Sequence, residues 1–255
     1  MRARDRRVAP EERAMFEAVR RVQEEAIRHF VRQVNTTGKA APIEGDDDYD
    51  WLLRNYRTCT PIIERTFRNA GQTGLRKARV GIAFNQNAPA AEAWIKARTQ
   101  RFVQQVAETA WTNLKTRLSD AMNRGSSVEE LTDIVRSLPD FAPGRAEMIA
   151  RTEVIGAYNG GLEEGFRQSG NVASKVWLAT LDDRTRETHL ELHETEVPVG
   201  EDFVSPSGAK GPAPGQMGEA SEDINCRCSL EAILGKAEPE IVEIPPGVNE
   251  TEVLA

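Results

Sequence analysis

The sequence predicts an α+β protein in which an extended helical region precedes a small mixed domain with a short antiparallel sheet. Apolar residues recur at three- and four-residue spacing through long stretches of the first 140 residues. Short alternating stretches, typical of strands, follow from Lys175 onward. Only 39% of the 255 residues are hydrophobic and 29% are charged, which favours long exposed helices or an assembly subunit. We place a helical region at 1–140, the small domain at 141–235 and a flexible acidic tail at 236–255.

The helical region is predicted to contain helices at 11–34, 60–79, 89–123 and 127–138. The third is the longest, and its length of about 50 Å suits a structural subunit. Ser127 and Glu130 form a capping-box pattern at the start of the fourth. The run of aspartates at 46–50 predicts a helix start and not a calcium loop, because Trp51 occupies the position where such a loop needs glycine.

The small domain is predicted to open with a helix at 144–169. Four glycines, at 156, 160, 161 and 165, give it one small-residue face, which favours close packing against a neighbouring backbone. A strand at 175–181, a short helix from Asp182 to His193, a strand at 197–203, a loop at 205–218 and a strand at 224–233 are expected to follow.

Two histidines and two cysteines of the small domain form a candidate metal site. His189 and His193 are four residues apart on the predicted helix, and Cys226 and Cys228 are two apart on the predicted strand, so each pair would share a face. Two imidazoles and two thiolates are a ligand set that tetrahedral zinc accepts. Two alternatives stay open: buried small residues entering a core, and a catalytic cysteine beside a histidine.

A group of charged residues surrounds this candidate site. Asp182, Arg184 and Arg186 precede His189, and they predict either a salt-bridge clamp between helix and strand or an anion-binding group. We favour the clamp. Arg151, Glu153 and Asn159 on the preceding helix would join it through a buried polar network.

Charge is unevenly distributed along the chain. Residues 61–117 hold ten Lys/Arg and three Asp/Glu, a net charge of +7, whereas residues 181–255 hold five and seventeen, a net charge of −12. The simpler interpretation of this uneven distribution is two solvated faces of opposite charge. The more specific hypothesis is that the basic helices at 61–117 lie near DNA phosphate. No apolar run reaches about 18 residues, so we expect no membrane span and no secretory signal. Three cysteines indicate a reducing compartment.

An ordered set of motifs runs through the second half of the chain. The motifs are Ile149-Ala-Arg-Thr-Glu153, Ala157-Tyr-Asn159-Gly, Lys175-Val-Trp177, Leu181-Asp-Asp-Arg-Thr-Arg186-Glu-Thr-His189, Phe203 and Ile224-Asn-Cys-Arg-Cys228, with Asn85, Pro89, Trp94 and Gly125 upstream. This set resembles the phage Mu protein F-like family of minor head proteins, and the resemblance covers roughly residues 85–234. The family commonly has a turn glycine after the histidine, where this chain reads Leu192-His193-Glu194. His193 is therefore a feature of this chain.

The resemblance implies a virion protein of the phage head, made in the host cytoplasm, present in few copies and associated with the portal protein, with capsid or scaffold proteins as further partners. It implies a role in head assembly and in DNA packaging or delivery, without catalysis. The signature positions would hold the small domain together, with or without zinc as the only cofactor; they are Arg151, Glu153, Asn159, Trp177, Asp182, Arg184, Arg186, His189, Asn225, Cys226 and Cys228. The rival hypotheses are a toxin-like effector or enzyme that uses the Cys/His site, and a zinc-stabilised binding module.

Overall fold

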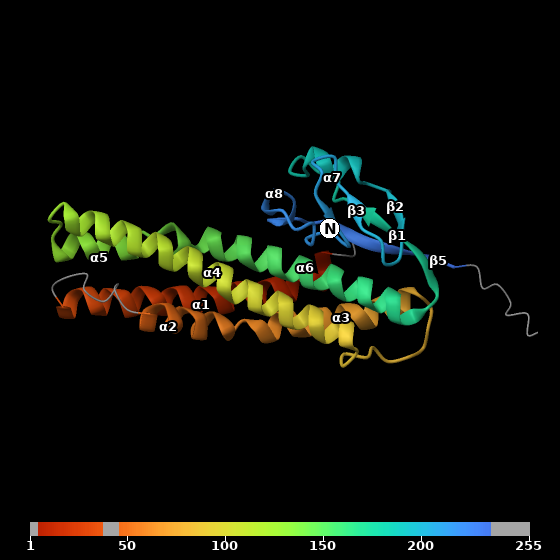
Figure 1. Cartoon of the computed structure of the whole chain (residues 1–255), viewed down its shortest axis with the longest axis horizontal. Helices are drawn as coiled ribbons and strands as arrows, with labels where there is room; N and C mark the ends of the chain where they lie inside the picture. The colour runs from red at the N-terminus through yellow and green to blue at the C-terminus, as the bar shows by residue number, and fades with distance from the viewer. Residues whose placement is uncertain (1–4, 38–45, 236–255) are drawn as a thin grey trace, which may run out of the picture.

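The computed structural model describes residues 5–37 and 46–235, and it confirms the predicted α+β architecture. A bundle of long helices forms an elongated body, and a small β-containing domain lies against one side of it (Figure 1). The predicted tail at 236–255 lies outside the described residues. The bundle helices are α1 (Asp5–Thr37), α2 (Asp46–Arg57), α3 (Thr60–Lys77), α4 (Pro89–Asn123), α5 (Val128–Arg136) and α6 (Pro143–Ser169), with a 3-10 turn, η2 (Pro139–Phe141), before α6.

Local sequence signals set several helix ends. The bounds of α4 agree with the prediction, with Pro89 at its first position. The capping box is present at α5: the Ser127 hydroxyl accepts from the amide of Glu130 at 3.2 Å, and the Glu130 carboxylate accepts from the amide of Ser127 at 2.7 Å. The acidic run begins α2, as expected from the preference of carboxylates for helix N-termini.

The glycine face of α6 packs against α3. A Cβ atom on Gly161 would lie 2.2 Å from the carbonyl oxygen of Phe67, and one on Gly165 would lie 2.3 Å from that of Gly71. The backbones of the two helices therefore touch at these positions, which only glycine permits. This contact also explains why Gly71 and Gly74 do not end α3, because tertiary packing outweighs their low helix propensity.

One hydrophobic core runs from the bundle into the small domain. It includes Phe30 and Leu114 among the long helices and continues to Trp177 and Phe203 beside the sheet. Helix α6 lies in the bundle and also carries the small domain (Figure 1). The bundle and the small domain thus share α6.

The small domain contains two short antiparallel sheets. The three-stranded sheet has the order β2-β1-β5, with β1 (Val172–Leu178) between β2 (Glu196–Pro198) and β5 (Ser229–Leu234), and Lys175 lies opposite Val197 and Ala232. The second sheet pairs β3 (Phe203–Val204) with β4 (Lys210–Gly211). Two short helices, α7 (Glu187–Glu191) and α8 (Ala220–Asp223), precede the turns that lead to β2 and β5.

Several predicted elements of the small domain differ from the structure. The first strand spans 172–178 rather than 175–181, and the helix expected from Asp182 to His193 spans only Glu187–Glu191. The expected strand at 197–203 is two strands in different sheets, and the expected loop at 205–218 contains β4. The last strand begins at Ser229 rather than at 224, because α8 precedes it and Asn225 has a φ of 59°, which interrupts extended backbone.

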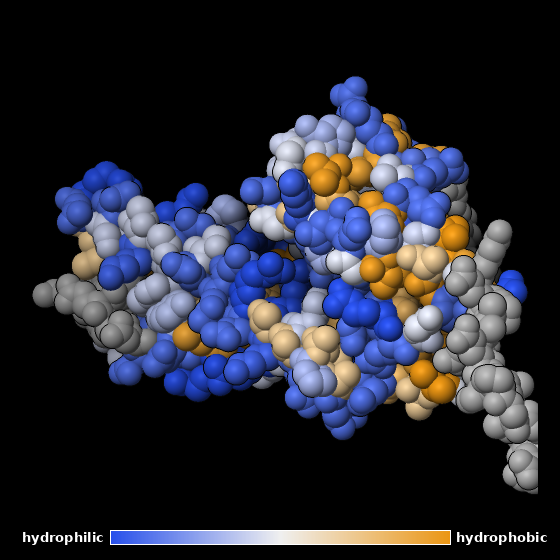
Figure 2. Space-filling model, turned by 45° about the vertical axis from the view of Figure 1, so that its right-hand side comes forward, coloured by the Kyte–Doolittle hydropathy of each residue, from blue (hydrophilic) through white to orange (hydrophobic). Residues whose placement is uncertain are grey.

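The surface differs between the two parts of the molecule. Hydrophilic residues dominate the bundle, whereas hydrophobic residues appear more often on the small domain (Figure 2). Four of the six large exposed hydrophobic side chains among the described residues belong to the small domain: Leu181, Leu190, Val204 and Ile233. No helix in the described ranges has the length and apolar character needed to cross a membrane.

Candidate functional site

Three of the four predicted metal ligands meet in the core of the small domain. His189 lies on α7, and Cys226 and Cys228 lie in the segment between α8 and β5. The Nδ1 atom of His189 is 3.4 Å from the Sγ of Cys228 and 3.9 Å from that of Cys226. All three side chains are about 1% exposed, and neither thiol forms a disulfide within the described chain.

Glu222 holds the opposite side of the His189 ring. Its Oε2 atom lies 2.8 Å from Nε2 of the histidine, although not in the alignment of an ideal hydrogen bond. The hydroxyls of Thr188, Ser205 and Ser207 donate to the same carboxylate at 3.0, 3.0 and 2.6 Å. Burial raises the pKa of Glu222, but these hydroxyl donors outweigh burial and lower it overall. The carboxylate is therefore held in its charged form beside the imidazole.

The environment of the thiols favours a thiolate. The hydrogen bond from Cys226 holds the pKa of the Cys228 thiol well below its usual range, and this effect exceeds the opposing effect of burial. The adjacent His189 ring adds to the lowering. Thiolate is the form of cysteine that binds metals and attacks electrophiles.

His193 does not join this cluster, so the predicted four-residue ligand set is wrong at that position. Helix α7 ends at Glu191, and the four-residue spacing places two side chains on one face only while the helix continues. The Nδ1 atom of His193 instead accepts a hydrogen bond from the amide of Ala179 at 3.2 Å. His193 is also partly exposed, unlike the three clustered residues.

The clamp predicted from Asp182, Arg184 and Arg186 is present only in part, because Asp182 forms its ion pair with Arg227, a partner that sequence analysis did not find. Among the described ion pairs, neither Arg184 nor Arg186 pairs with a carboxylate. Asp182 accepts two hydrogen bonds from the guanidinium of Arg227, and Arg186 donates to the carbonyl oxygen of Ile224. The Arg227 contact lowers the pKa of Asp182. Arg184 is exposed and contributes through its backbone amide, which donates to Asp182 at 3.0 Å.

The helix residues of the signature connect α6 to the same segment. Asn159 is fully buried, and its Nδ2 atom donates to the carbonyl oxygens of Pro214 and Cys228 at 3.0 and 2.9 Å. Arg151 donates to the side chain of Asn225 at 3.2 Å. Glu153 instead pairs with the buried Arg98 of α4 at 2.8 Å, so it links α6 to the bundle.

Trp177 lies beneath the site. It is fully buried on β1, and its ring makes edge-to-face contacts with His189 and Phe203 at centroid distances of 5.2 and 5.3 Å. These signature residues join α6, β1, α7 and the segment before β5 through hydrogen bonds to backbone groups and ring packing. Such contacts position chain segments relative to one another.

A buried ion pair next to Trp177 was not predicted. Lys175 is fully buried, its Nζ atom lies 2.9 Å from Glu163 of α6, and it donates to the carbonyl oxygen of Pro212 at 2.8 Å. Burial lowers the pKa of this amine. The strand alternation that places Trp177 inward places Lys175 on the same face, so the signal was present in the sequence.

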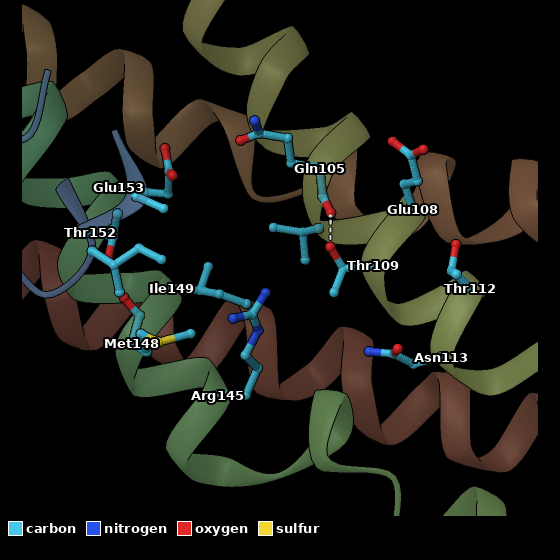
Figure 3. A pocket seen from close by; sticks show the side chains of 13 residues that line it. Gln105, Glu108, Thr109, Thr112, Asn113, Arg145, Met148, Ile149, Thr152 and Glu153 are labelled. Carbon is cyan, nitrogen blue, oxygen red and sulfur yellow. Dashed lines mark hydrogen bonds between the residues drawn. The ribbon is translucent and has the colours of Figure 1, made fainter. Parts of the chain in front are cut away.

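An open groove lies elsewhere in the molecule. It occupies about 580 Å³ between α4 and α6, and Glu108, Arg145 and Glu153 line it together with apolar residues such as Met148 and Ile149 (Figure 3). None of the three clustered His/Cys residues lines it. The His/Cys cluster is buried and lies apart from this open groove.

Comparison with known proteins identifies the family. Residues 112–231 match the family described as phage Mu protein F like protein. Over this segment the chain belongs to the phage Mu protein F-like family. The match covers a little under half of the chain and includes all the signature residues from Arg151 to Cys228. Residues 85–111, which the resemblance also included, lie outside it.

Curated relatives of this Mu F-like protein include proteins of different descriptions. It is 28% identical over 131 residues to minor head protein GP7 of Bacillus phage SPP1, covering 51% of this chain and 42% of the relative. It is 32% identical over 159 residues to NAD(+)–arginine ADP-ribosyltransferase EFV of Enterococcus faecalis, covering 61% and 31%. It is 26% identical over 170 residues to the uncharacterized protein YqbB of Bacillus subtilis, covering 64% and 54%. The chain thus spans about a third to a half of each relative. No solved structure matches it significantly.

Proposed function

We propose that this Mu F-like protein is a minor capsid protein of a phage head that associates with the portal and acts in head assembly and in DNA packaging or delivery. The similarity to minor head protein GP7 carries this proposal. It also follows that the protein would reside in the virion after assembly in the host cytoplasm, with the portal protein and capsid or scaffold proteins as partners.

The construction of the small domain supports an attachment role. Its signature residues hold backbone segments together, as Asn159 does for two loops. Its exposed hydrophobic side chains, including Leu190 and Val204, provide the kind of contact that protein–protein interfaces bury. The long bundle would then extend from this attachment as a rigid arm.

Co-expression with the portal protein from the same source tests the attachment. We expect the full chain to co-purify with the portal assembly through affinity and size-exclusion steps. Paired substitutions Leu190→Asp and Val204→Asp should reduce co-purification without changing the circular dichroism spectrum. Ile82→Asp provides a matched control, because this exposed hydrophobic residue lies between α3 and α4, outside the small domain. Failure of the full chain, expressed without a fusion partner, to associate with the portal protein or with head particles would contradict the proposal.

The proposal includes DNA contact along α3 and α4. Several basic residues in 61–117 already bind partners within the chain: Arg65 pairs with Glu11 at 2.7 Å, and Arg98 is buried. Lys96, Lys115 and Arg117 of α4 are exposed and remain suited to phosphate contact. Salt-dependent binding to duplex DNA, weakened by charge reversal at these three positions, is the expected result. Binding that does not change with salt would contradict this contact.

We propose that the chain acts without catalysis, and the transferase relative supplies the rival hypothesis. This chain covers only 31% of that relative, so the activity in its name has no necessary connection with the shared segment. Incubation of the purified chain with labelled NAD⁺ and an arginine acceptor tests the rival. We expect no label transfer, and transfer that depends on Cys228 or His189 would establish the enzyme hypothesis instead.

A further inference from the structure

We propose that His189, Cys226 and Cys228 form a zinc site in which Nδ1 of the histidine and the two sulfurs are ligands and Glu222 orients the histidine. The proposal goes beyond the head-assembly function, which does not require a metal. It replaces the predicted four-residue set with three ligands and one supporting carboxylate.

The distances agree with tetrahedral coordination. Zn–S bonds of about 2.3 Å and Zn–N bonds of about 2.0 Å place nitrogen and sulfur ligands about 3.5 Å apart around the metal. The observed separations of Nδ1 from the sulfurs are 3.4 Å for Cys228 and 3.9 Å for Cys226. The ligand atoms of all three residues lie within 4.8 Å of one another. The two nitrogen–sulfur distances thus lie within a few tenths of an ångström of the expected separation.

Both sulfurs approach the same imidazole nitrogen, and Cys226 also forms a hydrogen bond to Cys228. A neutral imidazole nitrogen has either one lone pair or one hydrogen, so Nδ1 forms one good hydrogen bond. Two thiols point at it, in a position that is about 1% exposed. A zinc ion satisfies the nitrogen and both sulfurs at once, with the sulfurs as thiolates.

The contact between Glu222 and the histidine is the usual support for a ligating imidazole. Metal-bound histidines commonly donate their second N–H to a carboxylate, which fixes the tautomer and the ring orientation. Here Nε2 lies 2.8 Å from Glu222 while Nδ1 faces the sulfurs. The three hydroxyl donors on Glu222 fix the carboxylate in turn. This arrangement leaves Nδ1 with its lone pair toward the metal.

The described residues supply three ligands, so we assign the fourth position to water. A Cys₂His set with one open position is known for zinc. Thiolate ligands favour zinc over magnesium or calcium, which prefer oxygen.

The test is the metal content of the full chain. The protein should be expressed in zinc-supplemented medium and purified without a histidine tag or a chelator. Mass spectrometry of metals should then find about one zinc per chain, as a single site requires. Cobalt substitution should give the thiolate-to-metal charge-transfer absorption of a two-cysteine site. Wild-type protein that holds no stoichiometric zinc, and takes none up after reconstitution, would overturn the proposal.

Matched variants locate the metal. Cys226→Ser, Cys228→Ser and His189→Gln should each lose zinc, whereas His193→Gln and Cys59→Ala should keep it, because neither residue belongs to the cluster. Glu222→Gln should retain zinc but weaken its affinity by about 10- to 100-fold in competition with a chelator.

Misfolding of a ligand variant would not obscure the result. Zinc in the folded wild-type protein should protect Cys226 and Cys228 from alkylation until a chelator is added, as peptide mapping would show. Full zinc retention in His189→Gln, loss of zinc in His193→Gln, or alkylation that is indifferent to the chelator would each contradict the proposed site.

Discussion

Substitution of Gly161 by alanine should destabilise the protein, although alanine favours helices. Helix propensity alone would stabilise α6 by about 1 kcal/mol. The new Cβ, however, would lie 2.2 Å from the carbonyl oxygen of Phe67 and 2.8 Å from the Cβ of Ala70. Relief of this overlap requires α3 and α6 to separate by about 1 Å, since carbon contacts are optimal near 3.5 Å. Overpacking of this kind costs about 1–3 kcal/mol, and the backbone obstacle places Gly161→Ala at the upper end.

The net expectation is a loss of about 2 kcal/mol in the free energy of unfolding, measured by urea denaturation followed by circular dichroism. Gly144→Ala is the matched control, because Gly144 lies in the first turn of the same helix and nothing lies within 4 Å of a Cβ added there. The control should leave stability unchanged or raise it by up to about 1 kcal/mol. Equal stability of the two variants would refute the proposed close packing of α3 on α6.

The remaining predictions concern the small domain. Asn159→Ala should lower the free energy of unfolding by about 2–5 kcal/mol, because the substitution removes the hydrogen-bond donor of two buried carbonyl groups. Urea denaturation measures this loss, and a change below about 0.5 kcal/mol would contradict the prediction. Lys175→Met should cost about 3 kcal/mol in the same assay, because it removes a countercharge from the buried Glu163 and leaves Arg167, at 3.5 Å, as its one cationic partner among the described residues. Adding Glu163→Gln should recover part of this loss, and no recovery would argue against the ion pair. The pKa of Asp182 is lower in the folded chain than in the unfolded chain, where it is about 4. The ion pair of Asp182 therefore stabilises the folded protein at pH values above about 4, and this stabilisation is lost as the pH falls below that value. Thermal unfolding of Asp182→Asn should therefore show a weaker pH dependence than wild type in that acidic range, and identical pH profiles would contradict the assignment.

Long helices were predictable because their signals are local. Pro89, a long apolar side and a closing glycine set the bounds of α4, and Ser127 with Glu130 set the start of α5. Each signal acts through neighbours within one turn, so the sequence contains it in full. The short elements of the small domain depend instead on pairing between distant segments, and their bounds shifted accordingly.

The candidate site was predictable in part for the same reason. The spacing of Cys226 and Cys228 and the arginine-rich motif before His189 identified residues that the fold brings together. His193 failed because the four-residue rule assumes a helix that in fact ends at Glu191. Glu222 carried no distinguishing pattern, since one glutamate in an acidic segment resembles any other until the fold places it against the imidazole.

The copy number of this protein in purified heads tests the central claim most directly. Quantitative mass spectrometry should compare heads that contain the portal with heads assembled without it. The account predicts a few copies per portal-containing head and none in portal-free heads. Equal amounts in both kinds of head, or absence from both, would contradict an attachment of this chain to the portal.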